Sequence, residues 1–326
     1  MAVHAPPELE AQYRTMQDGA GMLERSGRAV IAVTGPDAAD YLQGQVTNDV
    51  LALERHDGCY AALLNPKGRI LADMRVLCDG PAELWLDAER ETRETLIRHL
   101  EMYKIGRDVE VQDRTDARAI VSLIGPRAGF VLAGAATGEQ RRMPSGENEW
   151  TEARIAGEPV MAAATDVGLD VIYDARAREA VVDALSEAGA VPVEEAAAEV
   201  VRIERGRPRY GIDMTDDNLP GELGLEERAV SFTKGCYVGQ EPVARMYHRG
   251  HPNRILRGLR LTAPASAGEP LVRDGKEVGK VTSAGVSPRL GPIALAVVRR
   301  EVEPGGEVVV GERRGATVVE LPFETV

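Results

Sequence analysis

Aromatic residues, cysteines and histidines are scarce in this sequence of 326 residues. Aromatic side chains make up only 4% of it, so Ala, Val, Leu and Ile must fill most of the core. The three cysteines, Cys59, Cys78 and Cys236, are odd in number and far apart, which is typical of a reducing compartment. They form no CxxC or Cys/His cluster, and the five histidines are unclustered, so no self-contained metal site is expected.

Basic charge and long apolar runs are also lacking. The 39 Lys and Arg residues stand against 52 Asp and Glu, a net charge of -13. That balance excludes a general affinity for nucleic acid, which needs a basic surface. No apolar run is long enough to span a bilayer, and the first residues have neither the basic nor the apolar region of a secretory signal. We therefore expect a cytoplasmic protein without membrane contact.

The remaining composition is that of a globular chain long enough for two or three domains, with 44% hydrophobic and 28% charged residues. Periodicity predicts mixed helices and strands up to about residue 250, then only short strands and turns that indicate a small β-barrel. The expected helices cover residues 8–19, 36–53, 89–103, 175–188, 193–206 and 240–248. The expected strands before the barrel cover residues 28–34, 59–64, 69–78, 83–86, 109–112, 119–124, 154–164 and 169–173, with a loop over residues 133–150.

Two of these strands form a predicted hairpin that places a carboxylate on a partly apolar face. Asn65-Pro66-Lys67-Gly68 has the composition of a type I turn. In the second strand Asp73 shares its face with Leu71, Arg75 and Leu77. Two interpretations follow: an exposed face on which Asp73 pairs with Arg75, or a carboxylate that lines a ligand cavity.

The helix expected over residues 193–206 carries a second such carboxylate. Glu204 falls on the face that also presents Ala197, Val200 and Val201, and a buried carboxylate is costly unless it is paired or binds a ligand. One interpretation is a buried salt bridge to Arg202, Arg205 or Arg207. The other is a ligand site, because a carboxylate can accept two adjacent N–H groups at once.

Residues 231–250, SFTKGCYVGQEPVARMYHRG, mix glycines with polar and reactive groups, which is typical of a site. Cys236 would precede a helix that starts near Gln240, and Lys234 is two residues away. Both features favour a thiolate, which would make Cys236 a reactive or ligating thiol. The alternative is a buried small hydrophobe, which is the usual environment of a free cysteine. Residues 245–260 contain five arginines (245, 249, 254, 257 and 260). These could bind a polyglutamate tail or an RNA phosphate, or they could belong to a solvated linker.

The run Lys234 to Glu241, KGCYVGQE, resembles the signature of the YgfZ family, folate-binding proteins of iron-sulfur cluster maintenance. Its chemistry-bearing positions in this sequence are Lys234, Gly235, Cys236, Tyr237, Gly239, Gln240 and Glu241. Nearly the whole chain also resembles the wider superfamily of the glycine cleavage T-protein, an aminomethyltransferase that uses tetrahydrofolate and lacks this cysteine motif.

Four stretches carry the wider resemblance: residues 42–49, NPKGRILADMRV at 65–76, the block from Arg202 to Met214, and PGELGL at 220–225. The T-protein resemblance implies that Asp73 is a catalytic candidate, and the YgfZ resemblance implies the same for Cys236. The wider resemblance implies folate-binding roles for Asn65, Asp73, Glu204, Tyr210, Glu222 and Arg245. The T-protein has two consecutive acids where this chain has Ala72-Asp73, which argues against aminomethyl transfer.

The resemblance implies an α+β fold with two intertwined N-terminal α/β subdomains and a C-terminal β-barrel around a central folate cavity. The expected divisions are residues 1–250, with subdomains 1–115 and 116–250, and a barrel at 251–326. The implied function is a tetrahydrofolate-binding, monomeric factor for assembly or repair of iron-sulfur proteins, including tRNA-modifying enzymes. The alternative is a folate-dependent aminomethyltransferase.

Overall fold

The computed structural model describes residues 5–138 and 142–323. The chain divides into two compact units. The barrel unit comprises the described parts of residues 1–13, 194–226 and 241–326, and the two-sheet unit comprises those of residues 14–193 and 227–240. Each unit is therefore built from segments that are distant in the sequence.

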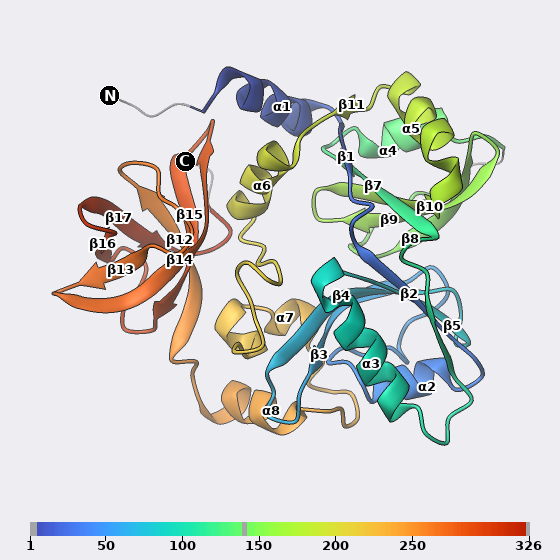
Figure 1. Ribbon diagram of the computed structural model, residues 1–326, viewed down its shortest axis with the longest axis horizontal. Helices are drawn as coiled ribbons and strands as arrows, with labels where there is room; N and C mark the ends of the chain where they lie inside the picture. The colour runs from blue at the N-terminus through green and yellow to red at the C-terminus, as the bar shows by residue number, and fades with distance from the viewer. Residues whose placement is uncertain (1–4, 139–141, 324–326) are drawn as a thin grey trace. The chain divides into compact units, whose positions relative to one another are not determined.

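One sheet of the two-sheet unit has five strands in the order β3-β4-β5-β2-β6. The strands are β2 (Ala29–Thr34), β3 (Gly58–Leu64), β4 (Ile70–Cys78), β5 (Glu83–Ala88) and β6 (Glu110–Asp113). Helices α2 (Ala38–Gln43) and α3 (Arg93–Tyr103), the latter preceded by a short 3-10 turn at Arg90–Thr92, pack on one face of this sheet (Figure 1). That face is entirely apolar at its centre, where Ile31, Leu63 and Met74 are buried.

The other sheet has six strands in the order β11-β1-β7-β10-β9-β8. The strands are β1 (Gly21–Glu24), β7 (Arg118–Ile124), β8 (Trp150–Ile155), β9 (Glu158–Thr165), β10 (Gly168–Asp174) and β11 (Val191–Pro192). Helices α4 (Ala128–Ala135) and α5 (Arg178–Glu187), the latter after a 3-10 turn at Ala175–Ala177, cover its outer face (Figure 1). Between the two sheets Trp85 packs in one cluster with Trp150, so the unit is layered helix, sheet, sheet, helix.

The barrel unit contains a closed six-stranded barrel in the order β12-β15-β14-β13-β16-β17. The strands are β12 (Arg254–Leu261), β13 (Pro270–Arg273), β14 (Lys276–Ser287), β15 (Gly291–Arg299), β16 (Glu307–Val310) and β17 (Arg314–Val319). Helix α6 (Glu195–Glu204) and a 3-10 turn at Pro220–Leu223 belong to this unit. Helices α1 (Pro7–Asp18), α7 (Glu226–Ala229) and α8 (Gln240–Arg249) span the points at which the chain passes between the units.

The predicted α+β class with N-terminal sheets and a C-terminal barrel is confirmed. The predicted hairpin is β3 and β4. The helix expected over residues 175–188 is the 3-10 turn and α5, and Asp174 caps its start, since its side chain accepts from the Arg176 N–H at 3.0 Å. The expected helix at 240–248 is α8. The domain boundaries at residues 115 and 250 stay predictions.

Three local predictions are wrong. The helix expected over residues 36–53 ends at Gln43, because Gly44 caps it and Val46 then pairs with Leu63. The single strand expected over residues 154–164 is interrupted by a turn at Ala156 and Gly157, both with positive φ, which joins the end of β8 to β9. The loop expected from residue 133 begins later, after α4, and residues 139–141 of it lie outside the described part of the chain.

No helix within residues 5–138 and 142–323 is long and apolar enough to cross a membrane.

Candidate functional site

The motif that the sequence singled out lies in an irregular loop of the two-sheet unit and is anchored by Lys234. Its ammonium donates to three backbone carbonyls, those of Gln43, Val46 and Asn48, at 2.6, 2.7 and 2.7 Å. Burial lowers the pKa of Lys234 to about 8. Lysine has three N–H donors and all three are used here, so Lys234 closes the C-terminal end of α2 and holds the motif loop against it.

Cys236 is exposed, whereas Lys234 and Tyr237 on either side of it are buried. The alternative of a buried small hydrophobe is therefore wrong for this cysteine. The Lys234 ammonium is bound by backbone carbonyls, and its expected effect on the Cys236 thiol stays a prediction. At Gly239, φ is +82° and an added Cβ would lie 2.5 Å from the Asn65 carbonyl oxygen, so only glycine fits.

Asn65 and Asp73 occupy the β3–β4 hairpin. Asn65 Oδ1 accepts from the backbone N–H groups of Lys67 and Arg69, so the side chain shapes the turn. Asp73 Oδ2 accepts from the Tyr60 hydroxyl at 2.7 Å, while its Oδ1 is buried and has no hydrogen-bond partner within residues 5–138 and 142–323. Burial raises the pKa of Asp73, against the opposing effect of the Tyr60 hydrogen bond. A buried oxygen without a donor is consistent with a site that is completed by a ligand.

The alternative in which Asp73 pairs with Arg75 is wrong. Arg75 instead lies between two other carboxylates, with Asp87 at 2.6 Å and Asp170 at 2.9 Å. Asp87 also binds Arg28 at 2.6 Å, and the two guanidinium groups hold the pKa of this carboxyl below its usual range although burial opposes them. Arg228, which no local pattern in the sequence marks, lies over the Tyr60 ring at 5.1 Å.

Glu204 ends α6 in the barrel unit and is 5% exposed, as the periodicity predicts. The Tyr13 hydroxyl donates to both carboxylate oxygens, at 3.1 Å and 3.0 Å. Ser287 donates to Oε1, and Arg289 Nη2 donates to Oε2 at 3.1 Å. The predicted salt-bridge partners Arg202, Arg205 and Arg207 are not the ones observed.

Arg202 instead holds the segment that follows α6 in place. It binds Glu199 and Asp213, each at 2.5 Å. The buried Asp213 also accepts from Thr282 and Ser283 of β14, so this carboxylate ties the segment to the barrel. Asp213 therefore has a structural role.

The other candidate side chains of the barrel unit lie closer to its surface. Tyr210 is half-buried and its backbone bridges to Met214. Glu222 accepts from the Leu219 N–H at 3.0 Å and so caps the 3-10 turn. Arg245 is exposed on α8 and pairs with Glu241 at 2.5 Å. Cys236, Asp73 and Asn65 thus belong to the two-sheet unit, whereas Glu204, Tyr210, Glu222 and Arg245 belong to the barrel unit.

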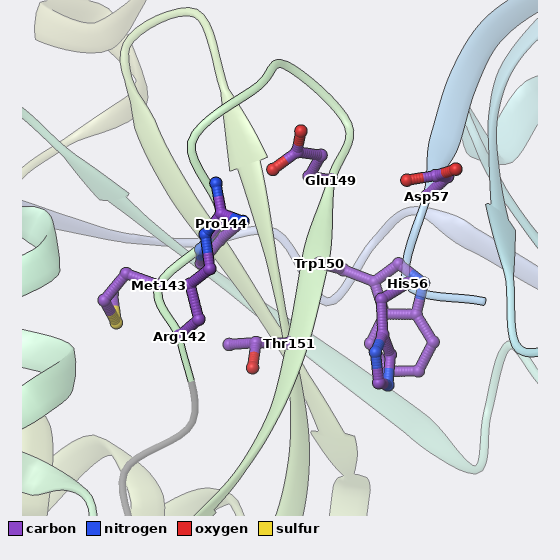
Figure 2. Close-up of a pocket in the computed structure, with 8 residues that line it drawn as sticks. All are labelled: His56, Asp57, Arg142, Met143, Pro144, Glu149, Trp150 and Thr151. Atoms are coloured by element: carbon purple, nitrogen blue, oxygen red, sulfur yellow. The ribbon is translucent and has the colours of Figure 1, made fainter. Parts of the chain in front are cut away.

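A pocket of about 380 Å³ in the two-sheet unit was not foreseen from the sequence. Figure 2 shows its walls, with the His56 ring edge-on to Trp150 at 4.6 Å between ring centroids. Its carboxylates are already engaged, since Glu149 accepts from the Ser145 N–H and Asp57 from the Glu54 N–H, both at 2.9 Å. None of the predicted site residues lines it. No group of three or more His, Cys, Asp or Glu within residues 5–138 and 142–323 could hold a metal ion.

Two family models match the chain. The GCVT N-terminal domain covers residues 4–234, and the glycine cleavage T-protein C-terminal barrel domain covers residues 254–324. The chain belongs to the glycine cleavage T-protein family. The hairpin at residues 65–76 and the block from Arg202 to Met214 carry the same resemblance in the sequence.

Curated relatives match over most of their length. An aminomethyltransferase of Synechococcus sp. (strain RCC307) is 30% identical, over 97% of this chain and 90% of its own length. One of Rubrobacter xylanophilus is 29% identical, over 97% of this chain and 86% of its own. A putative chloroplastic transferase of Arabidopsis thaliana is 28% identical, over 94% of this chain and 72% of its own.

The fold is also that of a solved member of the family. The glycine cleavage system aminomethyltransferase T from Bartonella henselae superposes with a TM-score of 0.88 at 24% identity, over 99% of this chain and 91% of that one. At this identity the similarity establishes the architecture of sheets and barrel.

Proposed function

We propose that this chain binds a reduced folate, tetrahydrofolate or a one-carbon derivative of it, and that Glu204 holds the pterin ring. The pterin presents an amino group and a ring N–H side by side, for which a carboxylate is the matching bidentate acceptor. The observation that carries the proposal is the buried Glu204 carboxylate, whose two oxygens already accept together from the single hydroxyl of Tyr13. Membership of the T-protein family supports it.

Binding would exchange donors at Glu204. Burial and the Glu204 charge raise the pKa of Tyr13 to about 12, so its hydroxyl keeps its proton at neutral pH and satisfies the carboxylate without ligand. The pterin would take over the two oxygens that Tyr13 bridges, while Ser287 and Arg289 keep their contacts. Arg289 is partly exposed and its charge offsets that of Glu204.

Asp73 is the second proposed contact of the bound folate. Its raised pKa and unpartnered Oδ1 suit a carboxyl that accepts or donates a proton at the one-carbon group. Tyr60 holds the other oxygen and so orients the carboxyl. Asn65, Tyr210, Glu222 and Arg245 are proposed as further folate contacts on the strength of the family resemblance alone.

The motif from Lys234 to Glu241 favours one use of the folate, which is support of iron-sulfur cluster assembly or repair, as in the YgfZ family. The client proteins would include tRNA-modifying enzymes. The exposed Cys236 on a loop anchored by Lys234 supports this use, because its sulfur is available to a client protein. The protein would then act as a cytoplasmic monomer that meets iron-sulfur proteins. We also propose that the domain boundaries of the chain lie near residues 115 and 250.

The second candidate is aminomethyl transfer to tetrahydrofolate, as the T-protein performs it. This candidate is supported by several relatives at 28–30% identity that are named aminomethyltransferases. Ala72 next to Asp73 is the feature that departs from the T-protein pattern.

One protein preparation tests both folate binding at Glu204 and the choice between the two candidate functions. Calorimetry should show tetrahydrofolate binding that weakens by about 2 kcal/mol or more in Glu204→Gln, because the amide turns one acceptor into a donor that faces the pterin's donors. Glu195→Gln, on the exposed side of the same helix, is the matched control and should bind normally. Unchanged affinity in Glu204→Gln contradicts the pterin assignment. An aminomethyltransferase assay with a lipoylated carrier protein and ammonia then separates the two uses, since transfer activity favours the second candidate.

A further inference from the structure

A second pocket, in the barrel unit, has a charge opposite to that of the chain. It has a volume of about 380 Å³ and is lined by Asn253, Arg254, Arg299, Arg300 and Glu301; we call it the arginine pocket. It lies where β12 begins and β15 ends. Three arginines and one acid meet here in a chain whose net charge is -13.

The barrel register forces two of these charges together. Arg254 is directly opposite Arg299 in the antiparallel pairing of β12 with β15, and like charges in that position destabilise a sheet. Arg300 follows at once, and its N–H donates to the Asn253 carbonyl at 3.0 Å, which fixes the corner. Glu301 is 3.7 Å from Arg299, but both side chains are more than half exposed, so this pair offsets little of the repulsion.

Two other arginines of the barrel strands are neutralised by a neighbouring carboxylate. Arg257 pairs with Glu320 and Arg314 with Glu269. Arg254 and Arg300, by contrast, form no ion pair with any residue in 5–138 or 142–323. A cluster of like charges that the sheet does not compensate favours a ligand of the opposite charge.

We propose that the arginine pocket binds a small polyanion with at least two phosphate or carboxylate groups. Guanidinium groups bind both kinds of oxyanion in bidentate fashion, and three of them can engage two neighbouring groups. The volume suits a small molecule, and the acidic remainder of the chain disfavours an extended nucleic acid. The phosphate source would be a free di- or triphosphate compound, and the carboxylate source an oligo-γ-glutamate chain. The inference stands independently of folate binding at Glu204.

The test is calorimetry on the full chain with pyrophosphate and, separately, tri-γ-glutamate, at ionic strength matched with sodium chloride. We expect one of the two to bind and the Arg254→Ala/Arg300→Ala double variant to weaken it at least tenfold. Glu301→Gln should tighten it several-fold, since it removes the carboxylate from the wall. Arg313→Ala, an exposed arginine of the same barrel, is the matched control and should change nothing. Glu204→Gln should also leave it unchanged, which keeps this test separate from that of the proposed function.

The two probes identify the source: pyrophosphate binding supports the phosphate source, and tri-γ-glutamate binding the carboxylate source. No binding above that of chloride overturns the proposal, as does an equal loss in Arg313→Ala. Tight binding of a short single-stranded RNA that the double variant and Arg313→Ala weaken alike would mean a diffuse basic surface, and overturns it as well. As an independent readout, Arg254→Ala should raise the melting temperature, because it relieves the cross-strand repulsion with Arg299.

Discussion

The Tyr13 hydroxyl donates to both carboxylate oxygens of Glu204, at 3.1 and 3.0 Å, across 191 residues of sequence. A buried carboxylate without donors would carry a large desolvation cost. Tyr13, together with Ser287 and Arg289, removes that cost before any ligand arrives. Glu204 can therefore serve the fold and a pterin in turn, and the two uses compete for the same oxygens.

This competition predicts opposite effects of Tyr13→Phe on stability and on affinity. Loss of the hydroxyl should lower the free energy of unfolding by about 2 kcal/mol, the usual worth of a hydrogen bond to a charged group. Tetrahydrofolate should bind as tightly as before or more tightly, because it no longer displaces a donor. Chemical denaturation and calorimetry measure the two. Tyr247→Phe, which changes an exposed side chain of α8, is the control. Weaker binding in Tyr13→Phe would mean that Tyr13 stays in place beside the ligand.

The same contact predicts a loss of stability at alkaline pH. The pKa of Tyr13 is raised in the folded chain from 10.0 to about 12. The folded state therefore holds this proton more tightly, and its contribution is complete below pH 10 and declines as the pH rises from 10 to 12. In Tyr13→Phe the slope of stability over that window should be shallower than in the parent chain. Identical slopes would place the titrating hydroxyl elsewhere.

The sequence predicted local relations well and long-range ones poorly. Strand alternation put Asp73 on the less apolar face of β4, and helical periodicity put Glu204 on the buried face of α6. The partners Tyr13 and Ser287 lie 191 and 83 residues from Glu204, and no local pattern marks them. The Lys234 ammonium binds carbonyls at and after the end of α2, and it lies 186 to 191 residues from them in the sequence. Helical periodicity does not register such a distant contact, and it predicted a helix that continues to residue 53.

Asp73→Asn should stabilise the chain while it impairs function. Burial raises the pKa of Asp73 above its usual value of 3.8, so the ionised form costs the folded state stability once the pH has risen through that raised pKa. The amide removes the cost, and the gain over the parent should vanish as the pH falls below about 3.8. Melting temperature against pH measures this, with the exposed Asp116→Asn as control. Folate affinity and cellular activity should fall; if both survive, Asp73 does not contact the folate.

Lys234→Met should destabilise the two-sheet unit by roughly 2–4 kcal/mol, because it leaves three carbonyls at the end of α2 without their donor. Lys67→Met, in the exposed hairpin turn, should have no measurable effect. Hydrogen exchange adds a local readout: amides near residues 43–50 should lose protection before those of the barrel. An undiminished free energy of unfolding would show that water replaces the ammonium at no cost.

Cys236 separates the two candidate uses of the folate. It is the exposed cysteine, while burial raises the pKa of Cys59 to about 12 and also raises that of Cys78. Iodoacetamide at neutral pH should therefore add a single label to the native chain, at Cys236, and none to Cys236→Ala; mass spectrometry reads both. Cys236→Ala removes little volume from a solvent-facing position, so folding and folate binding should survive. In cells that depend on this chain, iron-sulfur enzyme activity should fall with Cys236→Ala and persist with Cys78→Ala. Full rescue by Cys236→Ala, together with aminomethyl transfer in vitro, would make the transferase the better assignment, because that chemistry does not use this sulfur.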